Sequence, residues 1–142
     1  MSVSRSGVIK IYSNVDKNRL LHTVVRADAP SQRLDISPES EFLQVAKLTM
    51  DKGKTFTPHK HIYKDGEDEV IAQESWVVIR GEVKVILYDI DDRILYTDIL
   101  YPGDASVTFY GGHNYEILQD NTLVYEYKTG PYKGLKLDKV FI

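Results

Sequence analysis

The chain has 142 residues, 42% of them hydrophobic and 27% charged, which is typical of a single globular domain with its own core. The formal net charge of −3, without any run of lysine or arginine, argues against nucleic acid as a partner. The chain contains no cysteine, which excludes disulfides, cysteine zinc sites and thiol nucleophiles. Secreted chains of this length often carry disulfides, so the lack of cysteine favours a cytoplasmic location. No apolar run reaches membrane-spanning length, so we expect no membrane contact.

Short runs rich in valine, isoleucine and tyrosine predict β-strands along most of the chain. In chain order the predicted strands cover residues 8–12, 21–26, 42–50, 56–62, 69–79, 82–88, 93–100, 105–110, 115–118 and 123–128. The segments between them contain glycine, aspartate, asparagine or proline, as turns require. Residues 28–40 hold two prolines and several serines and are predicted to form a loop or arm, with a short helical turn near 38–42. Regularly spaced short strands with little helix predict an all-β sandwich, jelly roll or barrel.

Two histidines, His59 and His61, stand one residue apart in a predicted strand. Side chains at i and i+2 of a strand project to the same face, roughly 6–7 Å apart at their Cα atoms. Two imidazoles at that spacing can converge on one metal ion at about 2.0–2.1 Å. Pro58 favours an extended backbone before it and a position at a sheet edge. Taken alone, the pair is also compatible with two surface histidines on an edge strand.

Two more residues extend this pair to a possible ligand set. Glu74 is the first residue of a predicted apolar strand. If its side chain points inward, the buried carboxylate requires a partner such as a cation. The alternative is that Glu74 is the last residue of the solvated loop that precedes the strand. His113 follows Gly111 and Gly112, which permit a sharp bend. His22 has no comparable setting, so we interpret it as structural.

These residues together resemble the two motifs of the cupin superfamily, whose members have a small jelly-roll barrel. The first motif, Gly-x5-His-x-His-x3–4-Glu-x6-Gly, is matched by Gly53, His59, His61, Glu74 and Gly81. The second, Gly-x5-Pro-x-Gly-x2-His-x3-Asn, is matched by its two glycines, at positions 103 and 111. The resemblance implies an antiparallel jelly-roll barrel and a metal site formed by all three histidines and the glutamate.

Several positions depart from the motifs. Twelve residues separate His61 from Glu74, which we interpret as an enlarged loop, at residues 62–73, near the mouth of the cavity. His113 comes one residue early and Asn114 occupies the strict register, but imidazole is the better ligand for a divalent transition metal, so His113 is the expected ligand. Phe109 replaces the motif proline and Ile117 replaces the motif asparagine.

The GGH turn and a later Glu-x-Lys-x-Gly-Pro-Tyr run, starting at Glu126, resemble a subgroup of small bacterial cupins that is associated with surface-polysaccharide gene clusters. Glu126 and Lys128 share a strand face, so the two residues could instead form a charge pair on that strand. The resemblance implies one cupin domain over residues 1–142, with N-terminal strands and an arm at 1–40, a barrel core at 42–128 and a C-terminal extension at 129–142. Such arms pack between subunits in cupins, so we expect a homodimer.

A site of three histidines and one glutamate would bind zinc, iron, manganese or nickel, and this donor set does not select among them. The resemblance implies a metalloenzyme of the isomerase, epimerase or dioxygenase type that acts on a small polar or sugar-like ligand. A non-catalytic carbohydrate-binding cupin is the main alternative, and fold alone does not decide between them. A metal-free epimerase using His61 or His113 with a tyrosine is a third. The sequence predicts no other cofactor and assigns no catalytic residue.

Overall fold

The computed structural model describes residues 7–16, 18–27, 32–61, 72–131 and 139–142. All regular elements in this part of the chain are β-strands, and every strand pair is antiparallel. The predicted all-β class is therefore confirmed. Among these residues, no helix is long and apolar enough to span a membrane.

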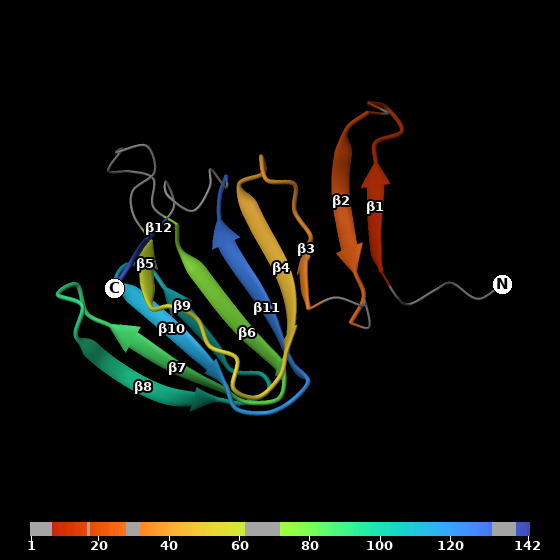
Figure 1. Cartoon of the computed structure of the whole chain (residues 1–142). Coiled ribbons are helices and arrows are strands. Elements are labelled where there is room, and N and C mark those ends of the chain that lie inside the picture. The colour runs from red at the N-terminus through yellow and green to blue at the C-terminus, as the bar shows by residue number, and fades with distance from the viewer. Residues whose placement is uncertain (1–6, 17, 28–31, 62–71, 132–138) are drawn as a thin grey trace.

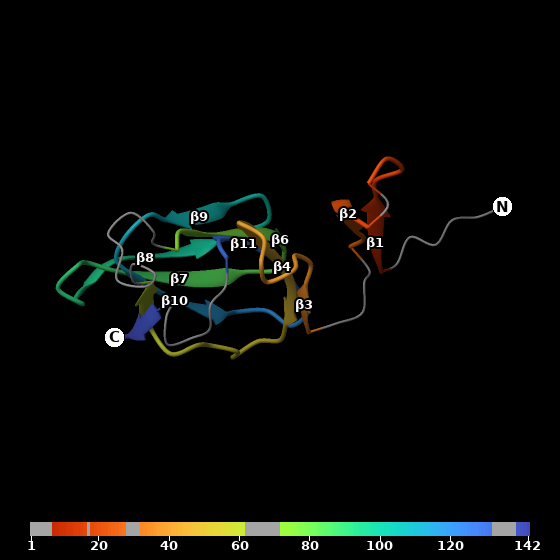
Figure 2. The same cartoon turned by 90° about the horizontal axis from the view of Figure 1, so that it is seen from above.

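Ten strands form two five-stranded sheets that face each other across the core (Figures 1 and 2). In one sheet the order is β12 (Lys139–Phe141), β5 (His59–His61), β10 (Gly112–Ile117), β7 (Val83–Tyr88) and β8 (Ile94–Leu100). In the other it is β3 (Arg33–Asp35), β4 (Leu43–Met50), β11 (Thr122–Thr129), β6 (Glu74–Arg80) and β9 (Ala105–Thr108). Each sheet contains strands from both halves of the chain, so residues far apart in the sequence share one interior.

The core lies between the two sheets, where each strand turns every second side chain inward. In β6 and β7 fully buried side chains alternate with half-buried ones, as the period of two requires. The buried cluster consists of Ala46, Leu48, Met50, Trp76, Val78, Val83, Val85, Leu100, Tyr115, Ile117 and Val124. Each large apolar side chain buried in this way stabilises the fold by about 1.5–3 kcal/mol.

Two motif glycines make turns that other residues would not tolerate. Gly81, between β6 and β7, has φ of 90°, and a Cβ at this position would collide with Thr122. Gly111 has φ of 97°, and a Cβ there would lie 2.9 Å from the carbonyl oxygen of Tyr88. Both positions therefore require glycine for conformational and steric reasons, and both turns precede strands that carry interior residues.

The structure corrects the predicted elements at four places. Strand β3 lies inside residues 28–40, which we expected to be irregular, and β12 was not predicted. Residues 38–42 form no helical turn; the amide of Glu41 donates to the carbonyl oxygen of Pro38 at 3.0 Å in a simple turn. Strand β10 begins at Gly112, three residues earlier than expected, so its third residue is Asn114 rather than a loop residue.

Strands β1 (Val8–Tyr12) and β2 (Leu20–Val25) form a separate two-stranded sheet. Figures 1 and 2 show this hairpin standing apart from the two larger sheets. It carries five exposed apolar side chains, those of Ile11, Tyr12, Val15, Leu21 and Val24. A two-stranded hairpin is marginally stable in water by itself.

Candidate metal centre

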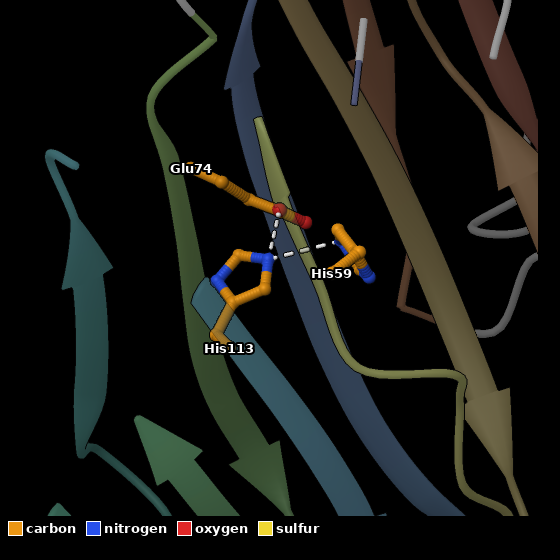
Figure 3. Close-up of side chains that lie close together, drawn as sticks. All are labelled: His59, Glu74 and His113. Atoms are coloured by element: carbon orange, nitrogen blue, oxygen red, sulfur yellow. Dashed lines mark hydrogen bonds and ion pairs between the residues drawn. The ribbon is translucent and has the colours of Figure 1, made fainter. Parts of the chain in front are cut away.

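Three donor side chains meet between the sheets: His59, Glu74 and His113 (Figure 3). The Nε2 atom of His113 lies 2.9 Å from Oε2 of Glu74 and 3.1 Å from Nε2 of His59. One donor atom from each of the three residues lies within 4.8 Å of the other two. His113 is fully buried and Glu74 is 6% exposed, so the cluster is nearly shielded from solvent. Three donors converging in this way could hold a metal ion.

Strand register brings these residues together. His113 on β10 pairs with His59 on the neighbouring strand β5, so both rings project to the same side. Glu74 begins β6 in the opposite sheet, where it pairs with Lys128 of β11 and with Thr108 of β9. The two sheets thus contribute two imidazoles and one carboxylate from opposite sides of the interior.

Each histidine is oriented by a hydrogen bond at its other ring nitrogen. Nδ1 of His59 lies 3.1 Å from the carbonyl oxygen of Thr57, which can only accept, so this nitrogen carries the hydrogen and donates. In the neutral ring, Nε2 then carries the lone pair that could bind a metal ion. Nδ1 of His113 lies 3.0 Å from the hydroxyl of Thr108. Such bonds at the far nitrogen are the usual way that metal-ligating imidazoles are held in place.

The two separations that involve His113 suit neighbouring positions around one ion. Two ligands bound at about 2.1 Å and at right angles to each other lie roughly 3 Å apart. The 2.9 Å and 3.1 Å separations around Nε2 of His113 match that value. Two imidazoles and one carboxylate, with positions left open, form a donor set that proteins use for iron and related divalent metals.

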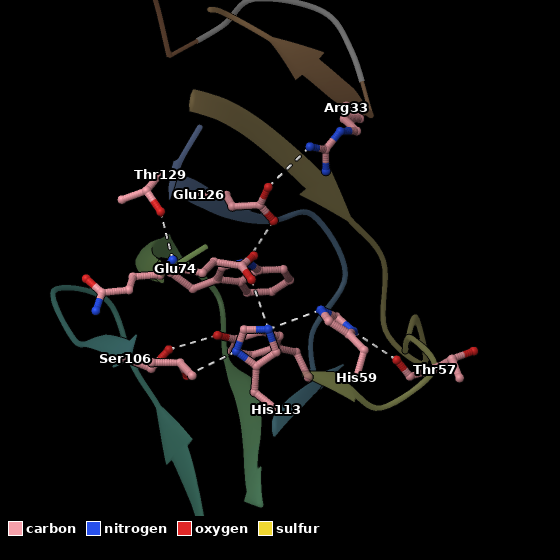
Figure 4. A network of polar contacts seen from close by, with 12 residues as sticks. Arg33, Thr57, His59, Glu74, Ser106, His113, Glu126 and Thr129 are labelled. Carbon is pink, nitrogen blue, oxygen red and sulfur yellow. Dashed lines mark hydrogen bonds and ion pairs between the residues drawn. The ribbon is translucent and has the colours of Figure 1, made fainter. Parts of the chain in front are cut away.

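A second buried carboxyl group lies behind Glu74. Glu126 on β11 is 8% exposed; Arg33 donates to its Oε1 at 3.2 Å and the Trp76 indole to its Oε2 at 3.0 Å (Figure 4). A hydrogen bond also joins the side chains of Glu126 and Glu74. Burial, followed by the nearby Glu74 carboxylate, raises the pKa of Glu126 above its ordinary value, and Arg33 opposes this shift. The sequence suggested a pair between Glu126 and Lys128 and gave no sign of these contacts.

Two aromatic side chains complete the wall of the site. The rings of Trp76 and Tyr115 stack with centroids 3.8 Å apart and planes within 3° of parallel. The hydroxyl of Tyr115 lies 3.0 Å from that of Ser106, and burial, followed by Glu74, raises the pKa of Tyr115. Trp76 therefore belongs to the core, while its indole nitrogen reaches the polar cluster.

The sequence-predicted residues are placed as follows. Glu74 points inward and His113 faces the interior, whereas the Asn114 amide donates to the hydroxyl of Thr55 at 3.3 Å, so His113 stays the predicted ligand of the two. The backbone of His61 lies in β5, but its side chain is outside the described part of the chain, so its role as a ligand stays a prediction. The enlarged loop also lies outside the described residues, apart from its last two positions. His22 is exposed on β2, a strand of the hairpin that stands apart from the two larger sheets.

Comparisons with known proteins bear on the fold. No family profile matches the chain, and no curated protein sequence matches it. Among solved structures, KdgF from Halomonas sp. has a TM-score of 0.54 at 22% identity, over 71% of this chain and 78% of that one. The capsular polysaccharide assembling protein CapF from Staphylococcus aureus has a TM-score of 0.63 at 17% identity, over 78% of this chain. Oxalate decarboxylase from Bacillus subtilis has a TM-score of 0.57 at 17% identity, over 78% of this chain.

The match spans 31% of the CapF chain and 27% of the oxalate decarboxylase chain, so the protein corresponds to one part of each. At these identities the likeness concerns the fold. These structural neighbours are cupin-fold proteins, as the spacing of the histidines, the glutamate and the glycines had predicted. The protein therefore shares the antiparallel jelly-roll fold of these neighbours.

Proposed function

We propose that the protein is a mononuclear metalloenzyme that holds a divalent transition metal with His59, Glu74 and His113, and with His61 as a fourth ligand. The observation that carries this proposal is the convergence of one donor atom from each of the first three residues within 4.8 Å in the interior. A buried carboxylate needs a compensating partner, and a metal ion among neutral imidazoles would supply one.

The metal would be zinc, iron, manganese or nickel. When bound, it would supply Lewis-acid polarisation of a carbonyl group or activation of dioxygen. The protein's own residues would fix the ligand geometry and exclude water, through the near-complete burial of Glu74 and His113. The reaction class that fits such a site is that of an isomerase, epimerase or dioxygenase acting on a small polar or sugar-like ligand, with a role in polysaccharide metabolism.

We also propose that residues 1–142 form one cupin domain that works as a homodimer in the cytoplasm, without nucleic acid or membrane partners. The exposed apolar side chains of the β1–β2 hairpin support the dimer, because a second subunit would cover them. In this arrangement residues 1–40 supply the arm, 42–128 the barrel core and 129–142 a C-terminal extension.

Elemental analysis of the purified protein tests the metal directly. We expect a single transition metal ion per chain, lost in the His59→Ala and Glu74→Gln variants and retained when the exposed His22 is replaced by alanine. Anomalous scattering at the site would identify the element. A protein without bound metal, whose affinity for added metal does not change on replacing His59, would contradict the proposal. Ligand-dependent melting shifts without turnover would instead indicate a non-catalytic carbohydrate-binding protein.

A further inference from the structure

Glu126 is a buried carboxyl group that belongs to neither cupin motif and is not in the proposed ligand set. It lies on β11, where it pairs with Trp76 of β6 on one side and with Ala46 of β4 on the other. Its side chain therefore points into the interior, toward the start of β6, where Glu74 is located (Figure 4). A carboxyl group at such a position, 8% exposed, is costly to bury unless hydrogen bonds compensate for the lost hydration.

The contacts of Glu126 leave it little freedom. Arg33 donates from a guanidinium nitrogen to Oε1 at 3.2 Å, and the Trp76 indole donates to Oε2 at 3.0 Å. The indole is itself fixed, because Trp76 is 2% exposed and stacked on Tyr115. With both oxygens engaged by donors on different strands, the Glu126 side chain is held in one orientation.

The same carboxyl group is hydrogen-bonded to Glu74, whose Oε2 lies 2.9 Å from Nε2 of His113. A continuous series of contacts therefore runs from Arg33 at the edge of one sheet, through Glu126 and Glu74, to His113 in the other sheet (Figure 4). A ligating carboxylate with one hydrogen-bonded oxygen has a fixed rotamer, and its other lone pairs remain directed at the metal. Without that bond, Glu74 would have to be ordered when the metal binds, which weakens binding.

We propose that Glu126 is the positioning residue that holds Glu74 in its metal-binding orientation, with Arg33 and Trp76 fixing Glu126 in turn. This inference rests on the metal-binding function proposed above and adds to it three residues outside the proposed ligand set. The N-terminal strand β3 thereby becomes part of the site, because it supplies Arg33. The role depends on hydrogen bonding rather than on the charge of Glu126, so a glutamine at this position should replace it.

The experiment titrates Co²⁺ into the full-length protein and follows its visible absorption, which reports ligand geometry. We expect Glu126→Gln to bind Co²⁺ within about threefold of the wild type, because its amide can still donate to Glu74 and accept from Trp76 or Arg33. Glu126→Leu should bind about 10–100-fold more weakly, the usual cost of losing an outer-shell partner. Glu116→Leu, at a half-buried glutamate of β10, is the matched control and should bind as the wild type does.

If Glu126→Leu does not fold, Arg33→Gln provides the test, because the Arg33 side chain is 48% exposed and its loss leaves the core intact. We expect a loss of roughly two- to tenfold in Co²⁺ affinity, less than that for a direct partner of Glu74. Unchanged Co²⁺ binding in Glu126→Leu or, where that variant does not fold, in Arg33→Gln would overturn the proposal. A Glu126→Gln variant as weak as Glu126→Leu would overturn it too, since the charge would then be the property that matters.

A measurement on the metal-free protein separates this inference from the metal proposal. The ring ¹⁵N resonances of His113 report its contact with Glu74, and they can be assigned with a His113→Gln variant. We expect them to be unchanged in Glu126→Gln and shifted in Glu126→Leu. Identical spectra in all three proteins would overturn the positioning role, whereas a wild type that binds no Co²⁺ but shows the expected shifts would overturn only the metal site.

Discussion

His59 and His113 lie opposite each other on adjacent antiparallel strands, and their Nε2 atoms are 3.1 Å apart. Their ring centroids are 4.8 Å apart and the ring planes are nearly perpendicular, at 85°. The rings therefore meet through their nitrogen-bearing edges rather than by stacking. Two nitrogens at this distance either share one hydrogen or bind one cation, and the carboxylate of Glu74 beside them favours the cation.

Replacement of His113 by alanine should abolish metal binding. His113 supplies the nitrogen nearest to both other donors, so we expect the metal affinity to fall by more than about 100-fold, beyond the usual cost of losing an outer-shell partner. Asn114→Ala is the matched control, because Asn114 is the adjacent residue and its amide is directed at Thr55. Calorimetric titration with zinc measures both variants. If Asn114→Ala lost metal affinity and His113→Ala retained it, Asn114 rather than His113 would be the ligand.

Replacement of Gly81 by alanine should destabilise the fold through a collision with Thr122. Gly53→Ala is a suitable control, since Gly53 has nearly the same backbone angle, φ of 93° against 90°, with no atom near the added Cβ. Both variants incur the strain of a left-handed alanine, and only Gly81→Ala adds the clash. We expect the free energy of unfolding in urea to be lower for Gly81→Ala by at least about 1 kcal/mol. Equal values for the two variants would contradict the steric explanation.

The raised pKa of Glu126 predicts a pH dependence of stability in the metal-free protein. A carboxyl group whose pKa is higher in the folded than in the unfolded state binds its proton more tightly when folded. Its stabilising contribution is complete below the ordinary value of 4.5 and is lost as the pH rises through the higher folded pKa. In chelator, the wild type should therefore lose stability relative to Glu126→Gln as the pH rises from 4.5. Urea unfolding at several pH values measures this difference, and a constant difference would contradict it.

Replacement of Leu21 by aspartate should dissociate the proposed homodimer. Leu21 is 50% exposed on the hairpin that stands apart from the barrel, and an aspartate in a buried subunit contact would be costly. Ile90→Asp is the control, because Ile90 is 67% exposed in the turn after β7. Light scattering should report a dimer for the wild type and for the control, and a monomer for Leu21→Asp. A monomeric wild type would contradict the dimer itself.

Much of the barrel could be predicted from the sequence because its longer strands are runs rich in valine, isoleucine and tyrosine between turn residues, as in β6 and β7. Strands β3 and β12 could not, since each has three residues and lies at a sheet edge, too short for any periodicity to be recognised. The spacing between Glu74 and Gly81 predicted Glu74, whereas strict motif spacing placed Asn114 at the histidine position, and His113 was preferred because imidazole is the better ligand for a transition metal. Only the pairing of β10 with β5 shows which of the two residues faces inward.

The contacts of Glu126 illustrate what the sequence could not reveal. Period two correctly put Glu126 and Lys128 on one strand face, but it could not identify the partners across the interior. Arg33, which donates to Glu126, is 93 residues away in the sequence and belongs to a segment without strand-like patterning. Such a contact depends on the packing of β3 against β4, which is a property of the assembled sheet.

The three-residue strand that carries His59 has β10 on one side and β12 on the other. During synthesis, the residues of β12 are the last of the described strands to leave the ribosome. Until they arrive, β5 has an unpaired outer edge, and the histidine strand can leave the sheet without breaking any bond to β12. Completion of this sheet therefore waits for residues 139–141, and a nascent chain stalled before residue 139 would present His59 on an incomplete sheet.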